Sequence, residues 1–270
     1  MIADEGQRAG PGTVAVLAWA GAVVVFLLAP VVIILIVSFS AADYLTFPPP
    51  GLSLRWYQRF FGVPSWRRAI EVSVQVASLT MLFATTVGLA AAVALVRGQF
   101  RRKGAVYAVL LSPAIVPTII TAIGLYFFFV RLKATGSILA MALGHTVLAL
   151  PIVVIIIAAT LQGFDIRFEQ AALSLGASRL TALRRITLPL IAPGVLSAAL
   201  FAFLTSFDEL LIPLFLSGVE TQTLTVRIWN SLTLEVDPTI AAVSSFLIGV
   251  TTAVLGASAL LRRRGEAPEA

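Results

Sequence analysis

The sequence predicts an all-α protein that crosses a membrane several times. Of its 270 residues, 59% are hydrophobic and only 12% are charged, and the mean hydropathy is +0.99. Soluble domains carry about 25% charged residues. Six apolar runs reach the roughly 20 residues that a helix needs to span a bilayer, and none alternates as a membrane β-strand does. Together these observations favour a polytopic helical membrane protein.

The apolar runs predict six transmembrane helices. The first run follows Arg8, as the apolar part of a signal peptide would. It is longer than the about 7–15 residues of such a part, and no small-residue cleavage site closes it. We therefore expect a retained helix, with a transmembrane domain at 13–262 between tails at 1–12 and 263–270. The expected spans are Val14–Phe39, Ala69–Val96, Ala105–Val130, Gly136–Thr160, Ala192–Leu216 and Ile240–Leu261.

The positions of Lys and Arg predict the orientation, because these residues gather in cytoplasmic loops. If both termini lie on one side, that side holds twelve basic residues and the other side holds seven. We expect both termini and the loop at 161–191 in the cytoplasm. The net charge of +6 then reflects topology and contact with anionic lipid headgroups, and no nucleic-acid partner is expected. The twelve are Arg8, Arg97, Arg101, Arg102, Lys103, Arg167, Arg179, Arg184, Arg185, Arg262, Arg263 and Arg264.

Prolines and runs of small residues occur within the predicted spans. Pro113 and Pro117 lie near the start of the third span, and Pro151 lies in the fourth. Such prolines are tolerated where neighbouring helices or water satisfy the freed backbone groups. The small residues of Gly88–Ala92 permit close approach of a second helix. We expect these features to serve helix packing.

Several kinds of chemistry are absent from the sequence. It has no cysteine, so a disulfide or a cysteine metal site is excluded. The lone His145 lacks clustered partners and is expected to be a buried core residue instead of a metal ligand. Neither a phosphate-binding Gly-x4-Gly-Lys-Ser/Thr loop nor a Gly-x-Ser-x-Gly nucleophile elbow is present. We expect no catalysis, metal or cofactor on this chain.

The segment at 161–191 is long, polar and amphipathic for a loop between spans. Its first part predicts a short helix with one apolar stripe. Gly176 then permits a turn. A second short helix is expected over Ser178–Thr187, ended by Pro189 before the fifth span. A loop of this kind is expected to dock against another protein. The predicted stripe comprises Ile166, Phe168, Ala171, Ala172 and Leu175.

The spacing in this loop resembles the EAA loop of permease subunits of ABC importers. The family pattern is Glu-Ala-Ala, three residues, Gly, nine residues and Ile-x-Leu-Pro. Gln170 occupies the usual Glu position, with Glu169 one residue earlier. The resemblance implies a type I ABC importer permease in which this loop is a coupling helix that docks into a groove of an ATPase subunit. The residues in register are Ala171, Ala172, Gly176, Ile186, Leu188 and Pro189, with Ala177 after the glycine.

Three further segments, Leu54–Tyr57, Ser206–Glu209 and Asp237–Ser244, look like permeases of the spermidine/putrescine branch. This resemblance implies a path for a small organic cation, foremost a polyamine, opened by alternating access. It implies a second, different permease chain, two ATP-binding subunits that hold ATP and Mg, and a periplasmic or lipid-anchored binding protein. The setting would be a bacterial inner membrane. Opine, other organic cation or ferric iron permeases remain alternatives, as do a secondary transporter and a structural scaffold.

Asp208 and Glu209 are candidates for the translocation path because they fall in the fifth predicted span. An acid at the bilayer centre costs about 2.5–3.5 kcal/mol on insertion scales, so it normally faces protein or water. Adjacent helical positions differ by about 100°, so one acid would face the path while the other pairs elsewhere. Alternatively, both cap or pair near the outer end. Tyr126 offers an aromatic face to a cation, or simply packs.

Overall fold

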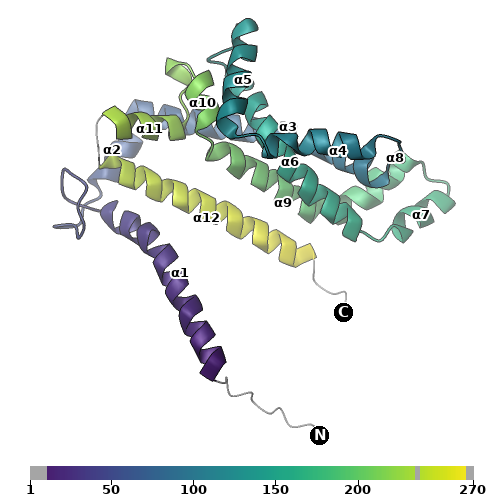
Figure 1. Ribbon diagram of the computed structural model, residues 1–270, viewed down its shortest axis with the longest axis horizontal. Helices are drawn as coiled ribbons and strands as arrows, with labels where there is room; N and C mark the ends of the chain where they lie inside the picture. Colours follow the sequence, from purple (N-terminus) through teal and green to yellow (C-terminus); the bar gives the residue numbers. More distant parts are fainter. Residues whose placement is uncertain (1–10, 235–237, 266–270) are drawn as a thin grey trace.

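The computed structural model describes residues 11–234 and 238–265, and it is a bundle of helices (Figure 1). Within these residues the only β-type feature is an isolated bridge between Ser40 and Leu52, so the all-α prediction is confirmed. The elements are α1 (Pro11–Val37), α2 (Arg55–Gly62), α3 (Pro64–Arg97), α4 (Lys103–Leu111), η1 (Ser112–Ala114), α5 (Thr118–Arg131), α6 (Ile138–Gly163), α7 (Arg167–Ser174), α8 (Arg179–Ala182), η2 (Leu183–Thr187), α9 (Leu188–Phe207), α10 (Leu211–Leu216), η3 (Val219–Thr221), α11 (Leu224–Leu234) and α12 (Thr239–Gly265).

Within the described ranges, five helices are long and apolar enough to cross a membrane, and there are six spans if a bent pair counts as one. The third predicted span, Ala105–Val130, is this bent pair. Its two parts, Lys103–Ala114 and Thr118–Arg131, meet at 98°. Pro113 begins a short 3-10 turn, and Pro117 precedes α5, so the backbone hydrogen-bond ladder stops between them. The third predicted span is therefore broken into two helices.

The fifth predicted span, Ala192–Leu216, is wrong at both ends. A continuous helical segment runs for 29 residues from Arg179 to Phe207, and α10 is a separate short helix. Pro189 does not end the preceding helix as expected. It lies in the first turn of α9, where a missing N–H is tolerated, and the π-helical turn η2 leads the chain into it.

The centre of the bundle is formed by α3, α6 and α9, which pack against one another, with α12 along α9. Small side chains allow this close packing, as predicted for Gly88–Ala92. A Cβ atom on Gly88 would lie 2.5 Å from Cγ1 of Val153 in α6, closer than real Cβ contacts. Pro151 lies within α6 without breaking it. A buried core of alanines and branched residues therefore holds the three helices together.

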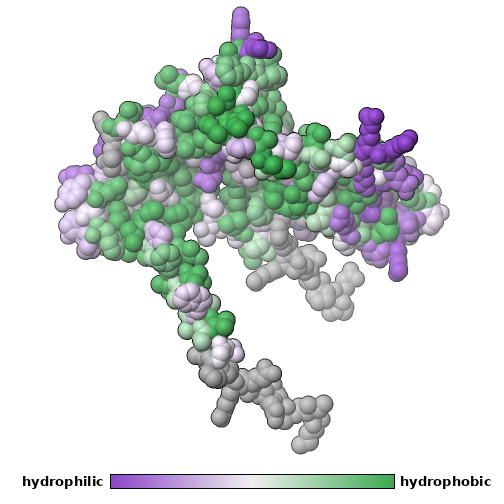
Figure 2. All heavy atoms as spheres, in the orientation of Figure 1, coloured by the Kyte–Doolittle hydropathy of each residue, from purple (hydrophilic) through white to green (hydrophobic). Residues whose placement is uncertain are grey.

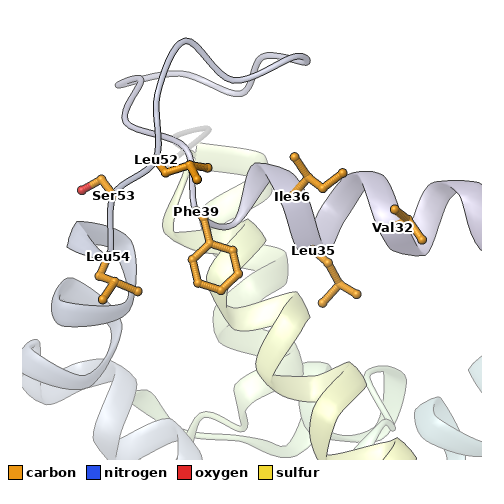
Figure 3. Close-up of a pocket in the computed structure, with 7 residues that line it drawn as sticks. All are labelled: Val32, Leu35, Ile36, Phe39, Leu52, Ser53 and Leu54. Carbon is orange, nitrogen blue, oxygen red and sulfur yellow. The ribbon is translucent and has the colours of Figure 1, made fainter.

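The α1 helix stands apart from this bundle, and its carboxyl end contacts the start of α12 (Figure 1). Of the most apolar stretch of α1, only 6% of the residues are buried. An apolar groove of about 710 Å³ lies beside its last turns, lined by Leu35, Phe39 and Leu54, with Ser53 as its polar residue (Figure 3). Figure 2 shows hydrophilic residues gathered at the opposite end, around α7 and α8, while the bundle sides are apolar.

Candidate functional site

The 161–191 loop folds as the short helix α7 and a turn, as the sequence predicts, but the second helix, expected to end before Pro189, continues through η2 into α9. The turn is at Gly176, whose φ of +89° is a left-handed conformation that favours glycine. The hydroxyl of Ser178 then accepts a hydrogen bond of 3.2 Å from the backbone N–H of Thr181 and caps α8. The turn and the cap fix where α7 ends and the long helical segment begins.

The α7 helix has an inner and an outer face, so the predicted apolar stripe is divided. Ala172 is 8% exposed and faces the bundle. Phe168 and Leu175 are 57% and 88% exposed, and with Ala171 they lie at helical spacings that share one face. Large apolar side chains on the outside of an eight-residue helix are suited to contact with another protein.

Glu169 is turned inward, away from the outer face of α7. Its Oε2 atom lies 3.6 Å from Nη2 of Arg97 at the end of α3 and accepts a 3.4 Å hydrogen bond from Oγ1 of Thr187. Gln170 is exposed, and its side chain has no hydrogen-bond partner in the described part of the chain. Glu169 therefore does not take the outward position that Gln170 occupies.

The other residues of the loop pattern surround this arrangement. Ala177, Ile186 and Leu188 are half-buried, whereas Pro189 is exposed. A cleft of about 680 Å³ lies between α7 and the ends of α3 and α6, and Glu169 lines it. Sequence reasoning missed Arg97 and Thr187 as partners of Glu169, since the signal for them was one basic residue at the end of a span.

Asp208 and Glu209 lie where α9 stops, at a break before α10. Oε1 of Glu209 accepts hydrogen bonds from the backbone N–H groups of Leu211 (2.6 Å) and Ile212 (3.0 Å), so this carboxylate caps α10. The carbonyl of Glu209 accepts a third bond, from Thr225. Asp208 is exposed, and its carboxylate has no hydrogen-bond or ion-pair partner among the residues described. The two acids thus differ in geometry.

A buried chain of hydrogen bonds lies one residue before this break and joins the three central helices. Nδ1 of His145 lies 2.7 Å from Oγ of Ser206, which donates over 3.2 Å to Oγ1 of Thr80. Thr80 in turn donates to the carbonyl of Ala142. Since each hydroxyl has one proton, Ser206 must accept from an Nδ1–H of His145. His145 is 1% exposed and is a core residue, as predicted.

Tyr126 packs among aromatic and apolar side chains of α5 and α10. Its ring lies 5.7 Å from that of Phe127 and 6.4 Å from that of Phe215, measured between centroids. This packing fits the plainer of its two predicted roles. In the described ranges, no group of three or more His, Cys, Asp or Glu side chains could hold a metal ion.

Two more segments resemble the spermidine/putrescine branch, Leu54–Tyr57 and Asp237–Ser244, and they lie at the starts of α2 and α12. In Leu54–Tyr57, Trp56 is buried beneath the Arg55 guanidinium, 4.4 Å from the ring centroid. The Tyr57 hydroxyl lies 2.8 Å from that of Ser38. In Asp237–Ser244 the first residue lies outside the described residues, Pro238 is in a turn, and the residues from Thr239 on begin α12.

Comparisons with known proteins agree with this arrangement. Residues 84–265 match the family described as binding-protein-dependent transport system inner membrane component. The chain is 34% identical over 239 residues to the spermidine/putrescine transport system permease protein PotC of Haemophilus influenzae, covering 88% of this chain and 93% of that protein. It is 32% identical over 231 residues to the putrescine transport system permease protein PotI of Escherichia coli, covering 83% and 82%.

A solved structure also has the same fold. It is a bacterial ABC transporter involved in the import of the acidic polysaccharide alginate, and one of its chains superposes with a TM-score of 0.71. The match covers 97% of this chain and 99% of that chain at 12% identity. At such identity the likeness concerns the fold, so the helix arrangement is that of ABC importer permeases whatever the substrate.

Proposed function

This chain belongs to the family of binding-protein-dependent transport system inner membrane components, and from that premise we propose that it helps form the path of a polyamine, spermidine or putrescine. It is a multi-pass inner membrane permease of the ABC importer type. Two permeases named for polyamines share about a third of their residues with it, over most of its length. That similarity is the main support for a cationic substrate.

Asp208 is the acid that we assign to the path. A polyamine carries ammonium groups, which an accessible carboxylate attracts. Asp208 is exposed at the helix break, whereas Glu209 is engaged in capping α10. Tyr126 contacts Phe215 within an apolar cluster and is assigned to packing. The groove beside α1 is almost entirely apolar and offers a polyamine no charged group.

Energy would enter through the outer face of α7. Phe168 and Leu175 expose apolar surface there, and Gln170 adds an unpaired amide. We infer that this face docks into a groove of an ATP-binding subunit, because the sequence has no phosphate-binding loop of its own. Two such subunits would hold ATP and Mg and perform the hydrolysis. A second permease chain and a periplasmic or lipid-anchored binding protein would complete the importer.

The α7 end would then face the cytoplasm, together with both termini. The excess of basic residues on that side and the hydrophilic surface around α7 and α8 (Figure 2) support this orientation. Because the chain lacks cysteine, single cysteines can report it. In intact cells Gln170→Cys should resist a membrane-impermeant maleimide and Glu220→Cys should react. The reverse pattern would refute the orientation.

Uptake by the assembled importer tests the assigned substrate and acid. Cells that carry all subunits should accumulate labelled spermidine or putrescine, and Asp208→Asn should lower uptake about tenfold, the effect of losing one charge–charge contact of about 1.4 kcal/mol. Glu220→Gln, another exposed acid, is the matched control and should keep uptake normal. Uptake by Asp208→Asn equal to that of the original protein, at equal membrane levels, would remove Asp208 from the path. Failure of the complete importer to accumulate either polyamine would contradict the assignment of a polyamine substrate.

A further inference from the structure

One charged cluster lies beneath the proposed docking helix and belongs to no part of the docking face. It consists of Arg97 at the end of α3, Glu169 on the inner face of α7 and Thr187 in η2, and is called the Arg97–Glu169–Thr187 cluster here. The Arg97 and Glu169 side chains are 23% and 18% exposed. Charged groups that are so far desolvated are stable only when paired.

The geometry makes one carboxylate oxygen the meeting point of three elements. Oε2 of Glu169 lies 3.6 Å from Nη2 of Arg97 and 3.4 Å from the hydroxyl of Thr187, which is fully buried. The Arg97 guanidinium also lies 5.6 Å from the ring centroid of Phe164, just before α7. Arg97 therefore reaches both the start and the middle of the loop from α3.

The contacts in this cluster are long. The separation of 3.6 Å permits an ion pair without a hydrogen bond, and Nε and Nη2 of Arg97 are buried without a hydrogen-bond partner among the described residues. A small shift of α7 can shorten these contacts or lose them. In a partly buried site such a change in distance alters the interaction strongly, because solvent screens it little.

We propose that the Arg97–Glu169–Thr187 cluster positions α7 against α3, so that movement of the docking helix reaches α3 as well as α9. Apart from the cluster, α7 is joined to the core by its covalent links to α6 and α8 and by the buried side chain of Ala172, and none of these reaches α3 directly. The three helices α3, α6 and α9 form one packed centre. A displacement of α7 that is transmitted to both α3 and α9 would move the packed helices as a unit. This proposal rests on the proposed function, because it concerns how an ATPase subunit drives this chain.

The test measures transport and ATP hydrolysis together in the reconstituted importer, using Arg97→Gln, Glu169→Gln and the exchanged pair Arg97→Glu with Glu169→Arg. Each single variant should retain copurification of the ATPase subunits. The amount of polyamine moved per ATP should fall about three- to tenfold, the range for losing a partly buried ion pair. The exchanged pair should recover part of that loss. Arg101→Gln, an exposed arginine four residues later, should leave the ratio unchanged.

Thr187→Val provides a milder variant if a charge change prevents membrane insertion. It keeps the side-chain shape, removes the hydroxyl, and should reduce the same ratio by a smaller factor. An unchanged ratio in all of these variants would overturn the positioning role. Loss of ATPase copurification would also overturn it, because the residues would then serve docking itself. Failure of the proposed function would be seen separately, as absence of ATP-dependent polyamine uptake by the original protein.

Discussion

The two ends of the long helical segment Arg179–Phe207 are built differently. At its first end α7 presents exposed apolar side chains, and its polar contacts beneath are the long ion pair to Arg97 in α3 and one hydrogen bond to Thr187. At its last end the chain Thr80–Ser206–His145 is fully buried, and Glu209 caps α10 through two backbone N–H groups. The first end is accessible, while the second is fixed within the bundle.

The difference indicates how force could cross the chain. A helix of 29 residues is about 40 Å long at ~1.5 Å per residue, so it spans the hydrocarbon core. A partner acting on the accessible end would move a rod whose far end is locked to two other helices. Asp208 lies immediately beyond that locked end. Changes at the first end should therefore affect partners, and changes at the second should affect stability.

The largest expected effect is at the accessible end. Leu175→Ser removes an 88% exposed side chain and should weaken ATPase binding by about ten- to a hundredfold, since burial of a leucine contributes about 1.5–3 kcal/mol. Copurification of the ATPase subunits measures this. The melting temperature of the isolated permease should stay unchanged. Normal copurification would show that the outer face of α7 is not the docking surface.

A comparable loss, now in folding stability, is expected at the fixed end. Ser206→Ala leaves the Nδ1–H of His145 without its acceptor in a buried site, which costs about 1–3 kcal/mol. Thermal unfolding of the detergent-solubilised protein should show a clear decrease. Ser174→Ala, on the exposed α7 helix, is the control and should stay within about 0.5 kcal/mol. Equal melting temperatures for the two variants would contradict the contrast between the ends.

A smaller effect is expected from the cap of α10. Glu209→Ala removes the acceptor for two backbone N–H groups and should destabilise the protein by about 1 kcal/mol. Glu209→Gln keeps a side-chain oxygen and should lose less. The unfolding midpoint in denaturant, compared with that of Asp208→Asn, separates capping from substrate contact. If Asp208→Asn were the more destabilised variant, the two acids would have been assigned the wrong roles.

Much of the fold could be predicted because hydropathy is a local property of the sequence. Four of the six apolar runs correspond to single helices, α1, α3, α6 and α12. The third run is divided into two helices and the fifth has other bounds, since apolarity alone does not show where a helix breaks. Pro113 and Pro117 break the helix of the third run, whereas Pro151 and Pro189 lie in helices that continue past them. The outcome depends on whether neighbouring helices and local π or 3-10 turns satisfy the backbone.

The candidate site was predictable in position but not in the role of each residue. The loop pattern located α7, the Gly176 turn and the start of α8, but not the continuation of α8 through η2 into α9. Which of Asp208 and Glu209 is accessible depends on the start of α10, which the sequence did not indicate. The contact between Glu169 and Arg97 joins residues 72 positions apart. Such a pair is formed by tertiary packing and has no signature in a single sequence.

Binding of ATP-binding subunits at α7 should change the break beyond Phe207. A single cysteine at Leu210, half-buried in that break, can be introduced into this cysteine-free chain and assembled with cysteine-free partner subunits. Its maleimide labelling rate in the reconstituted importer should change when ATP is bound, and the change should disappear when Leu175→Ser is added. A labelling rate that is the same with and without ATP would contradict the account.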